Sequence, residues 1–113
     1  MNGSARPVAV VVGWVVRYPV AGMAWSFLHY LLALRDLGFE PVFMEAAIEP
    51  ESCYDVAAGD LTSDPSYGVR FLRSCFSATG LEGTRWWYAD GDRDWGMSRE
   101  EAIATLEGSA VLL

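Results

Sequence analysis

Apolar and amphipathic runs alternate along this chain, most clearly in its first third. Residues 8–16 are almost continuously apolar and β-branched, which is typical of a strand buried on both faces of a parallel sheet. Residues 23–37 have apolar positions at helical spacing, Gly38 suits the left-handed residue after a helix, and residues 41–45 resume an extended pattern. This order predicts a right-handed βαβ unit.

The alternation of helices and strands continues to the last residue. The further predicted elements are helices over 65–79 and 99–107 and strands over 84–88 and 109–113, joined by acidic loops over 46–63 and 89–96. Asp64 and Pro65 form a favourable helix start, as N-cap and first helical residue. Ser98 and Glu101 have the spacing of a capping box.

These elements predict an α/β fold, a Rossmann-like open parallel sheet of about four strands with helices on both faces, in the order β-α-β-loop-α-β-α-β. With 113 residues, the chain is long enough for one domain, residues 1–113, and too short for two. A buried parallel strand is an unusual place for a chain to end. We therefore interpret the chain as half of a larger protein, truncated after its last strand. An exposed Leu112–Leu113 edge would favour self-association.

The amino-acid composition argues against two classes of binding partner. The net charge is −7, and all eight basic residues are scattered arginines, so nucleic acids and anionic membranes are not expected partners. Residues 18–34 are apolar, but Pro19 and Gly22 interrupt them and the run is shorter than the roughly 20 residues that a bilayer requires. No stable membrane insertion is predicted.

The cysteines and acidic residues do not predict a metal site. Cys53 and Cys75 belong to no CxxC pair, and a single histidine cannot complete a usual zinc set. The chain is therefore expected to be cytoplasmic, with reduced thiols. The alternate aspartates of residues 90–94 resemble a calcium loop, but Trp95 occupies the position that requires glycine.

The best candidate for a ligand site is the turn between the first strand and the first helix. In open α/β sheets, ligands bind beyond the carboxyl ends of the strands, where helix N–H groups are free to meet an anion or a sugar hydroxyl. Gly22 permits close backbone approach in this turn. The predicted substrate-binding residues are Tyr18, Gly22, Trp25, Ser26 and Glu45.

His29 is the predicted catalytic residue because it is the one side chain here that could act as a general base near neutral pH. Its alternative interpretation is a helix histidine that packs and bonds locally, and Trp25 could equally belong to the core. Glu45 lies 23 positions after Gly22, where a dinucleotide fold places an acid for a ribose. The glycine fingerprint of that fold is absent.

The segment PVAGMAWSFLHYLLALRDLGFEPVFME resembles the opening of GT-B-fold glycosyltransferase-like proteins, with Phe39 where a histidine is common. The later segments SDPSYGVRFLRSCFSATGL, TRWWYADGDRDWGMSREEA and LEGSAVLL are similar to the same bacterial branch. The resemblance thus spans nearly the whole chain.

The resemblance implies the N-terminal, acceptor-side domain of an enzyme that transfers a sugar from a nucleotide-sugar donor to an acceptor hydroxyl. The donor would bind mainly to a C-terminal domain absent here, so this chain would be inactive alone and hold no cofactor itself. Gly22 in the turn and His29 as an acceptor-side base carry over from the family. Two alternatives remain. One is a stand-alone Rossmann-like nucleotide-binding protein that uses Glu45 on a ribose, and the other is a non-catalytic module that binds a partner through its acidic loops.

Overall fold

The computed structural model describes residues 6–48 and 51–113, and in them it has seven strands and three helices. In chain order these are β1 (Val8–Val12), α1 (Ala21–Asp36), β2 (Glu40–Ala46), β3 (Cys53–Asp55), β4 (Asp60–Thr62), α2 (Ser66–Ala78), β5 (Arg85–Asp90), β6 (Arg93–Gly96), α3 (Arg99–Glu107) and β7 (Val111–Leu112). All three predicted helices are present. The bounds of α1 and α2 are shifted by one or two residues, and α3 has the predicted bounds.

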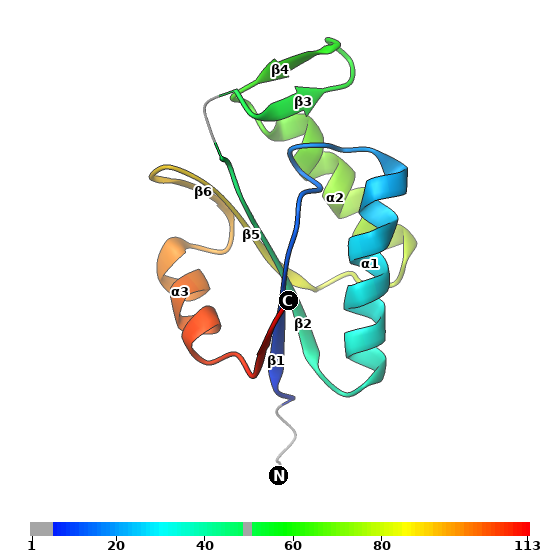
Figure 1. Ribbon diagram of the computed structural model, residues 1–113, viewed down its shortest axis with the longest axis vertical. Helices are drawn as coiled ribbons and strands as arrows, with labels where there is room; N and C mark the ends of the chain where they lie inside the picture. The colour runs from blue at the N-terminus through cyan, green and yellow to red at the C-terminus, as the bar shows by residue number, and fades with distance from the viewer. Residues whose placement is uncertain (1–5, 49–50) are drawn as a thin grey trace.

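Five of the strands form one sheet in the order β6-β5-β2-β1-β7 (Figure 1). β1 is parallel to β2 and β7, and β2 is parallel to β5, whereas the edge strand β6 is antiparallel to β5. β3 and β4 form a separate antiparallel hairpin. The carboxyl ends of β1, β2 and β5 therefore lie at one edge of the sheet, where the loop from β1 to α1 begins.

The predicted fold, a Rossmann-like open parallel sheet of about four strands with helices on both faces, is wrong because the sheet is not wholly parallel. The sheet is mixed and has five strands, because residues predicted as an acidic loop return along β5 as the antiparallel strand β6. The register pairs Asp90 with Arg93 across a two-residue turn in which Gly91 has φ +60°. Glycine adopts this conformation without steric cost, so the turn closes a hairpin. The loop predicted over 46–63 likewise contains the β3–β4 hairpin.

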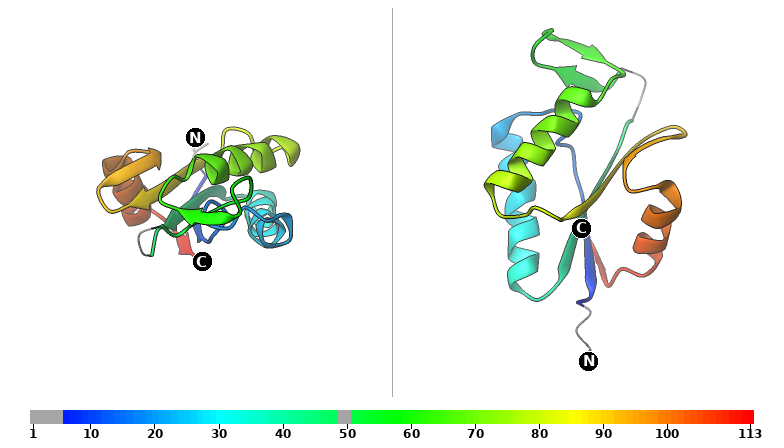
Figure 2. Two further views of the ribbon diagram at one scale, coloured as in Figure 1. Left: turned by 90° about the horizontal axis from the view of Figure 1, so that it is seen from above. Right: turned by 180° about the vertical axis from the view of Figure 1, so that it is seen from behind.

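The larger of two hydrophobic clusters joins the sheet to α1 and α2, which lie together on one side of the strands (Figure 2). Ala9 and Val11 belong to this cluster, while Val10 between them packs in a second cluster with Ala102 of α3. Alternate strand residues point to opposite faces, so β1 is buried on both sides, as its composition predicted. Leu31 of α1 is fully buried, and such a side chain contributes about 1.5–3 kcal/mol to the free energy of unfolding.

The end of α1 follows the sequence signal at Gly38. This glycine has φ +99°, and the N–H of Phe39 donates to the carbonyl oxygen of Leu34 at 3.0 Å. Such bonds satisfy carbonyls that the helix end leaves free. The chain can therefore reverse directly into β2.

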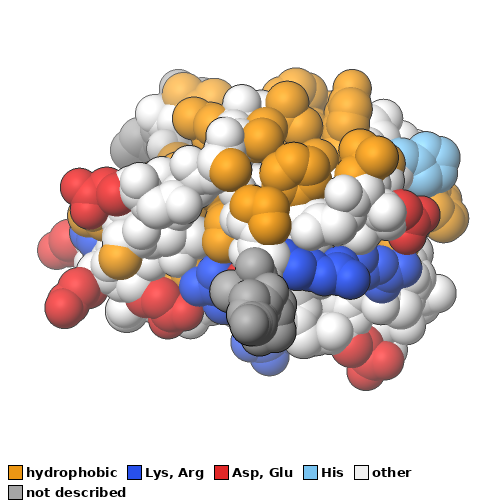
Figure 3. Space-filling view, turned by 90° about the horizontal axis from the view of Figure 1, so that it is seen from below, with side chains coloured by type: hydrophobic (Ala, Val, Ile, Leu, Met, Phe, Trp, Pro, Cys, Tyr) orange, Lys and Arg blue, Asp and Glu red, His pale blue; other side chains and the backbone are white. Residues whose placement is uncertain are grey.

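The surface carries several exposed apolar side chains. Leu112 is 61% exposed and Leu113 is 55% exposed at the β7 edge, and Figure 3 shows hydrophobic side chains gathered along one side of the molecule seen from below. Self-association through this edge stays a prediction. Within the described parts of the chain, none of the helices has the length and apolar character needed to cross a membrane.

Candidate functional site

The β1–α1 loop (residues 13–20) is held by the carboxylate of Glu45 at the end of β2. Oε1 accepts hydrogen bonds from the backbone N–H groups of Val15 and Val16, each at 2.8 Å. Oε2 accepts from the backbone N–H of Arg17 at 2.8 Å and from its guanidinium Nε at 3.2 Å. Because these amides donate to Glu45 and not to a neighbouring strand, β1 ends at Val12 and not at residue 16 as predicted.

Glu45 is only 1% exposed, so its charge depends on these four donors. Burial raises the pKa of the Glu45 carboxyl above its usual value, whereas the three loop amides and the charge of Arg17 act in the opposite direction. A buried carboxylate is tolerated when such donors surround it. The pair therefore fixes the loop backbone and the arginine together.

Two further contacts hold the same loop from outside. The backbone N–H of Tyr54 in β3 donates to the carbonyl oxygen of Arg17 at 2.7 Å. Gly68 of α2 packs so closely on Val16 that a Cβ at this glycine would lie 2.0 Å from the Val16 carbonyl oxygen. The loop is thus fixed by β2, β3 and α2, which is the rigidity that a binding site requires.

A pocket of about 330 Å³ opens over this loop and is lined by Trp14, Arg17, Tyr18, Met23 and Ile48. Trp14 and Tyr18 are each 42% exposed, whereas Arg17 is only 8% exposed. The pocket lies at the carboxyl ends of β1 and β2, the usual ligand position in open α/β sheets. It is large enough for a small ring compound.

The structure divides the predicted site residues between two places. Tyr18 lines the pocket, and Glu45 lies within the protein and shapes the loop that bears Arg17. Trp25 and His29 instead contact each other along the exposed side of α1, with ring centroids 5.2 Å apart and the ring planes tilted by 49°.

Gly22 and Ser26 are exposed on α1. Nothing lies within 4 Å of a Cβ placed at Gly22, so no protein contact requires a glycine there. Trp25 also lines a small groove of about 110 Å³ between α1 and α2.

The sequence interpretation missed four of the lining residues, which are Trp14, Arg17, Met23 and Ile48. Trp14 was assigned to the first strand, and Arg17 to the start of the turn that was predicted to meet a ligand, without a binding role of its own. One signal was available, because Arg17 directly follows a long apolar run, and an arginine that is buried with such a run needs a buried partner or a cavity. Arg17 has both.

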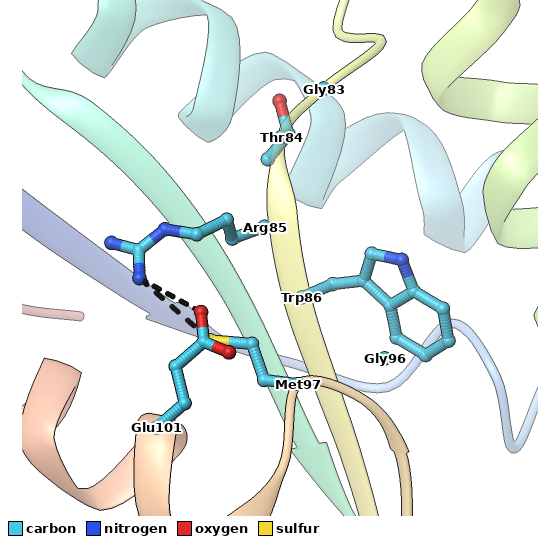
Figure 4. A pocket seen from close by; sticks show the side chains of 7 residues that line it. All are labelled: Gly83, Thr84, Arg85, Trp86, Gly96, Met97 and Glu101. Carbon is cyan, nitrogen blue, oxygen red and sulfur yellow. Dashed lines mark hydrogen bonds and ion pairs between the residues drawn. The ribbon is translucent and has the colours of Figure 1, made fainter.

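A larger pocket, of about 430 Å³, lies instead at the amino end of β5 (Figure 4). Its arginine, Arg85, is paired with Glu40 at 3.0 Å and with Glu101 at 3.4 Å. The same guanidinium donates to the hydroxyl of Thr105 at 3.1 Å. Because these partners already satisfy the arginine, we prefer the pocket at the carboxyl ends of the strands as the functional site.

Asp90 and Asp94, two of the three acidic residues of the β5–β6 hairpin, bond to neighbouring side chains. Asp90 pairs with Arg93, and Asp94 pairs with Arg99 at 3.1 Å and accepts from the indole N–H of Trp87 at 2.7 Å. In residues 6–48 and 51–113, no three side chains of His, Cys, Asp or Glu are placed to hold a metal ion.

Comparison with protein-family models, curated proteins and solved structures found no match to the chain. The resemblance to glycosyltransferases therefore stays a prediction from the sequence.

Proposed function

We propose that this domain binds the acceptor of a sugar transfer in the pocket over the β1–α1 loop. The nucleotide-sugar donor would be held by another part of the complete enzyme, and this chain alone would be inactive. The observation that carries the proposal is the buried Glu45–Arg17 pair, which fixes a guanidinium under a pocket with exposed aromatic walls.

The walls and the floor of the pocket suit different parts of such an acceptor. Trp14 and Tyr18 offer exposed rings, on which a sugar or another ring can stack. Arg17 offers hydrogen-bond donors, and its Nε contact with Glu45 limits the orientations of the guanidinium. Stacking and a fixed donor together would orient the acceptor hydroxyl.

His29 remains the candidate base under this proposal, but its position restricts the acceptor. It lies eight residues after the first residue of α1, which is about 12 Å along the helix axis. A hydroxyl in contact with His29 would therefore belong to an acceptor that extends from the pocket along α1 towards Trp25. A shorter acceptor would need a base from elsewhere.

The nucleotide-binding alternative is less well supported by the geometry. A ribose on Glu45 would have to compete with the four donors that the carboxylate already accepts. The non-catalytic alternative would use the acidic loops, and most of the acidic side chains in the β5–β6 hairpin are already paired. A cytoplasmic location is also part of the proposal, and Cys53 and Cys75, both free thiols, are compatible with it.

A binding titration with 4-nitrophenyl β-D-glucoside, a probe that combines a sugar and a ring, tests the proposal. We expect Trp14→Ala to weaken binding at least about fivefold, since loss of one stacked ring removes about 1 kcal/mol or more. Tyr30→Ala is the control because Tyr30 is an exposed aromatic residue of α1 that does not line the pocket. Equal binding by wild type and Trp14→Ala would contradict the proposal. UDP-glucose is expected to bind the isolated chain weakly, and tight binding would favour the nucleotide-binding alternative.

A further inference from the structure

We infer that the ligand of the β1–α1 pocket carries an anionic group, a carboxylate or a phosphate, attached to an apolar ring. This inference rests on the proposed function and specifies the chemical class of the acceptor. It follows from the charge around Arg17 and from the character of the pocket walls.

Arg17 is a buried arginine with unused donors. More than nine-tenths of the residue is buried, and its Nε contacts Glu45. Its two terminal nitrogens make no hydrogen bond to any side chain or backbone group of residues 6–48 and 51–113, although the residue lines the pocket. A guanidinium has five N–H donors in a planar fork, and the terminal nitrogens of Arg17 are accessible from the pocket, since they are not among the fully buried side-chain atoms without a partner. A ligand oxygen would supply the missing partners.

The negative charge of the Glu45 carboxylate does not occupy the side of Arg17 that faces the pocket. Each of its two oxygens already accepts two hydrogen bonds, three of them from loop amides. Among the described residues that line the pocket, none is acidic, although the whole chain has a net charge of −7. The exposed side of the guanidinium therefore has no anion facing it in the part of the chain that the structure describes.

The start of α1 adds to the positive potential at the pocket. Its first turn contains no acidic residue, and its N-cap, Val20, has no side-chain hydrogen bond to the helix. The free N–H groups of a helix start carry partial positive charge and favour an anion. Met23 of this first turn lines the same pocket as Arg17, so both positive groups act on one ligand.

The other lining residues determine the remainder of the ligand. Trp14, Tyr18, Met23 and Ile48 present rings and apolar chains, and all four are exposed to solvent. A ring that covers them would remove this apolar surface from water, while its anionic group binds Arg17. As the acceptor of a sugar, such a molecule also needs a hydroxyl, which makes a hydroxylated aromatic acid the simplest example.

The test compares 4-hydroxybenzoate with 4-hydroxybenzyl alcohol, which share the ring and the phenol but differ in charge. We expect the acid to bind at least about tenfold more tightly than the alcohol, because hydrogen bonds to an ionised group are the stronger ones. Phenyl phosphate, titrated in parallel, distinguishes a phosphate from a carboxylate, and either preference supports an anionic group. Equal binding of acid and alcohol overturns this inference alone, whereas binding of neither overturns the proposed function as well.

Met23→Glu tests the role of the pocket without removing Arg17. An acid in the first turn of a helix is favourable for folding, and this one would compete with the ligand for the guanidinium. We expect the ratio of acid to alcohol affinity to fall to about twofold or less. Ala33→Glu is the control, because Ala33 is exposed on the same helix and does not line the pocket. A ratio unchanged by Met23→Glu, or lowered equally by Ala33→Glu, overturns the inference.

Discussion

The carboxylate of Glu45 and the guanidinium of Arg17 form a buried ion pair, with Oε2 and Nε 3.2 Å apart. The same carboxylate accepts three backbone N–H groups of residues 15–17. One side chain at the end of β2 therefore holds both the backbone of the β1–α1 loop and the charged group of the pocket. We therefore expect both the stability of the fold and ligand binding in the pocket to depend on Glu45.

Glu45→Ala should be strongly destabilising. The substitution leaves a buried arginine and three loop amides without their partner, which typically costs about 3–5 kcal/mol in the free energy of unfolding. Urea denaturation measures this change. Glu40→Ala is the control on the same strand, because Glu40 pairs with Arg85 at the surface, where such pairs contribute at most about 1 kcal/mol. Equal losses for the two variants would show that the Glu45 network does not organise the fold.

Gly68→Ala and Gly22→Ala should have opposite effects on stability. A Cβ at Gly68 would lie 2.0 Å from the Val16 carbonyl oxygen, so α2 or the loop has to move. Overpacking of this kind costs about 1–3 kcal/mol. Gly22 lies in α1 with nothing near its would-be Cβ, and alanine there should stabilise by up to about 1 kcal/mol through helix propensity. Thermal unfolding of both variants checks these two predictions. An unchanged unfolding temperature for Gly68→Ala would contradict the close packing of α2 on the loop.

Stability should decrease in alkaline solution because of Tyr88 and Cys53, whose hydroxyl and thiol lie 3.1 Å apart in the protein interior. Burial raises the pKa of the Tyr88 hydroxyl above its ordinary 10.0 and that of the Cys53 thiol above its ordinary 9.0. Above these ordinary values the unfolded chain releases its protons while the folded protein retains them, so the free energy of unfolding falls as the pH rises.

Denaturation midpoints measured from pH 8 upward test this dependence, and the ordinary pKa of 10.0 for a tyrosine sets the range to compare. Tyr88→Phe lacks the buried hydroxyl, so its stability should fall less steeply above that pH. Identical slopes for the variant and the wild type would exclude Tyr88 as the cause.

Ser98→Ala should weaken α3 by about 1 kcal/mol, since the Ser98 hydroxyl accepts the backbone N–H of Glu101 at 3.1 Å. Ser77→Ala is a suitable comparison because Ser77 is exposed inside α2, where alanine is the better helix former. Chemical denaturation should give a lower free energy of unfolding for Ser98→Ala than for Ser77→Ala. Equal values would mean that the Ser98 cap contributes little to stability.

The sequence predicted the parts of the fold that depend on local patterns. The buried strand at Val8–Val12, the glycine end of α1 and the Ser98 cap all follow from the identity and spacing of neighbouring residues. The other half of the capping box is different, because the Glu101 side chain contacts Arg85. That partner lies on another element, where local spacing gives no information.

The incorrect sequence predictions concern short strands and contacts between segments that lie far apart in the chain. β3, β4 and β6 have three or four residues each, too few for a hydrophobic period, and all three lie in acidic sequence that resembles a loop. Glu45 was assigned to ligand binding from its distance to Gly22 along the chain. Its partners in residues 15–17 became visible only once β1 and β2 were aligned.

The most direct test of the binding site is a titration of isotope-labelled protein with 4-hydroxybenzoate, followed by NMR of the five tryptophan indole N–H groups. The pocket predicts that the Trp14 signal shifts in proportion to occupancy, together with backbone amides of residues 17–23. The Trp25 signal should stay in place, and Trp14→Phe should identify the shifting resonance. Shifts centred on Trp25, or on Trp86 beside the larger pocket, would contradict the assignment of the site to the loop that Glu45 holds.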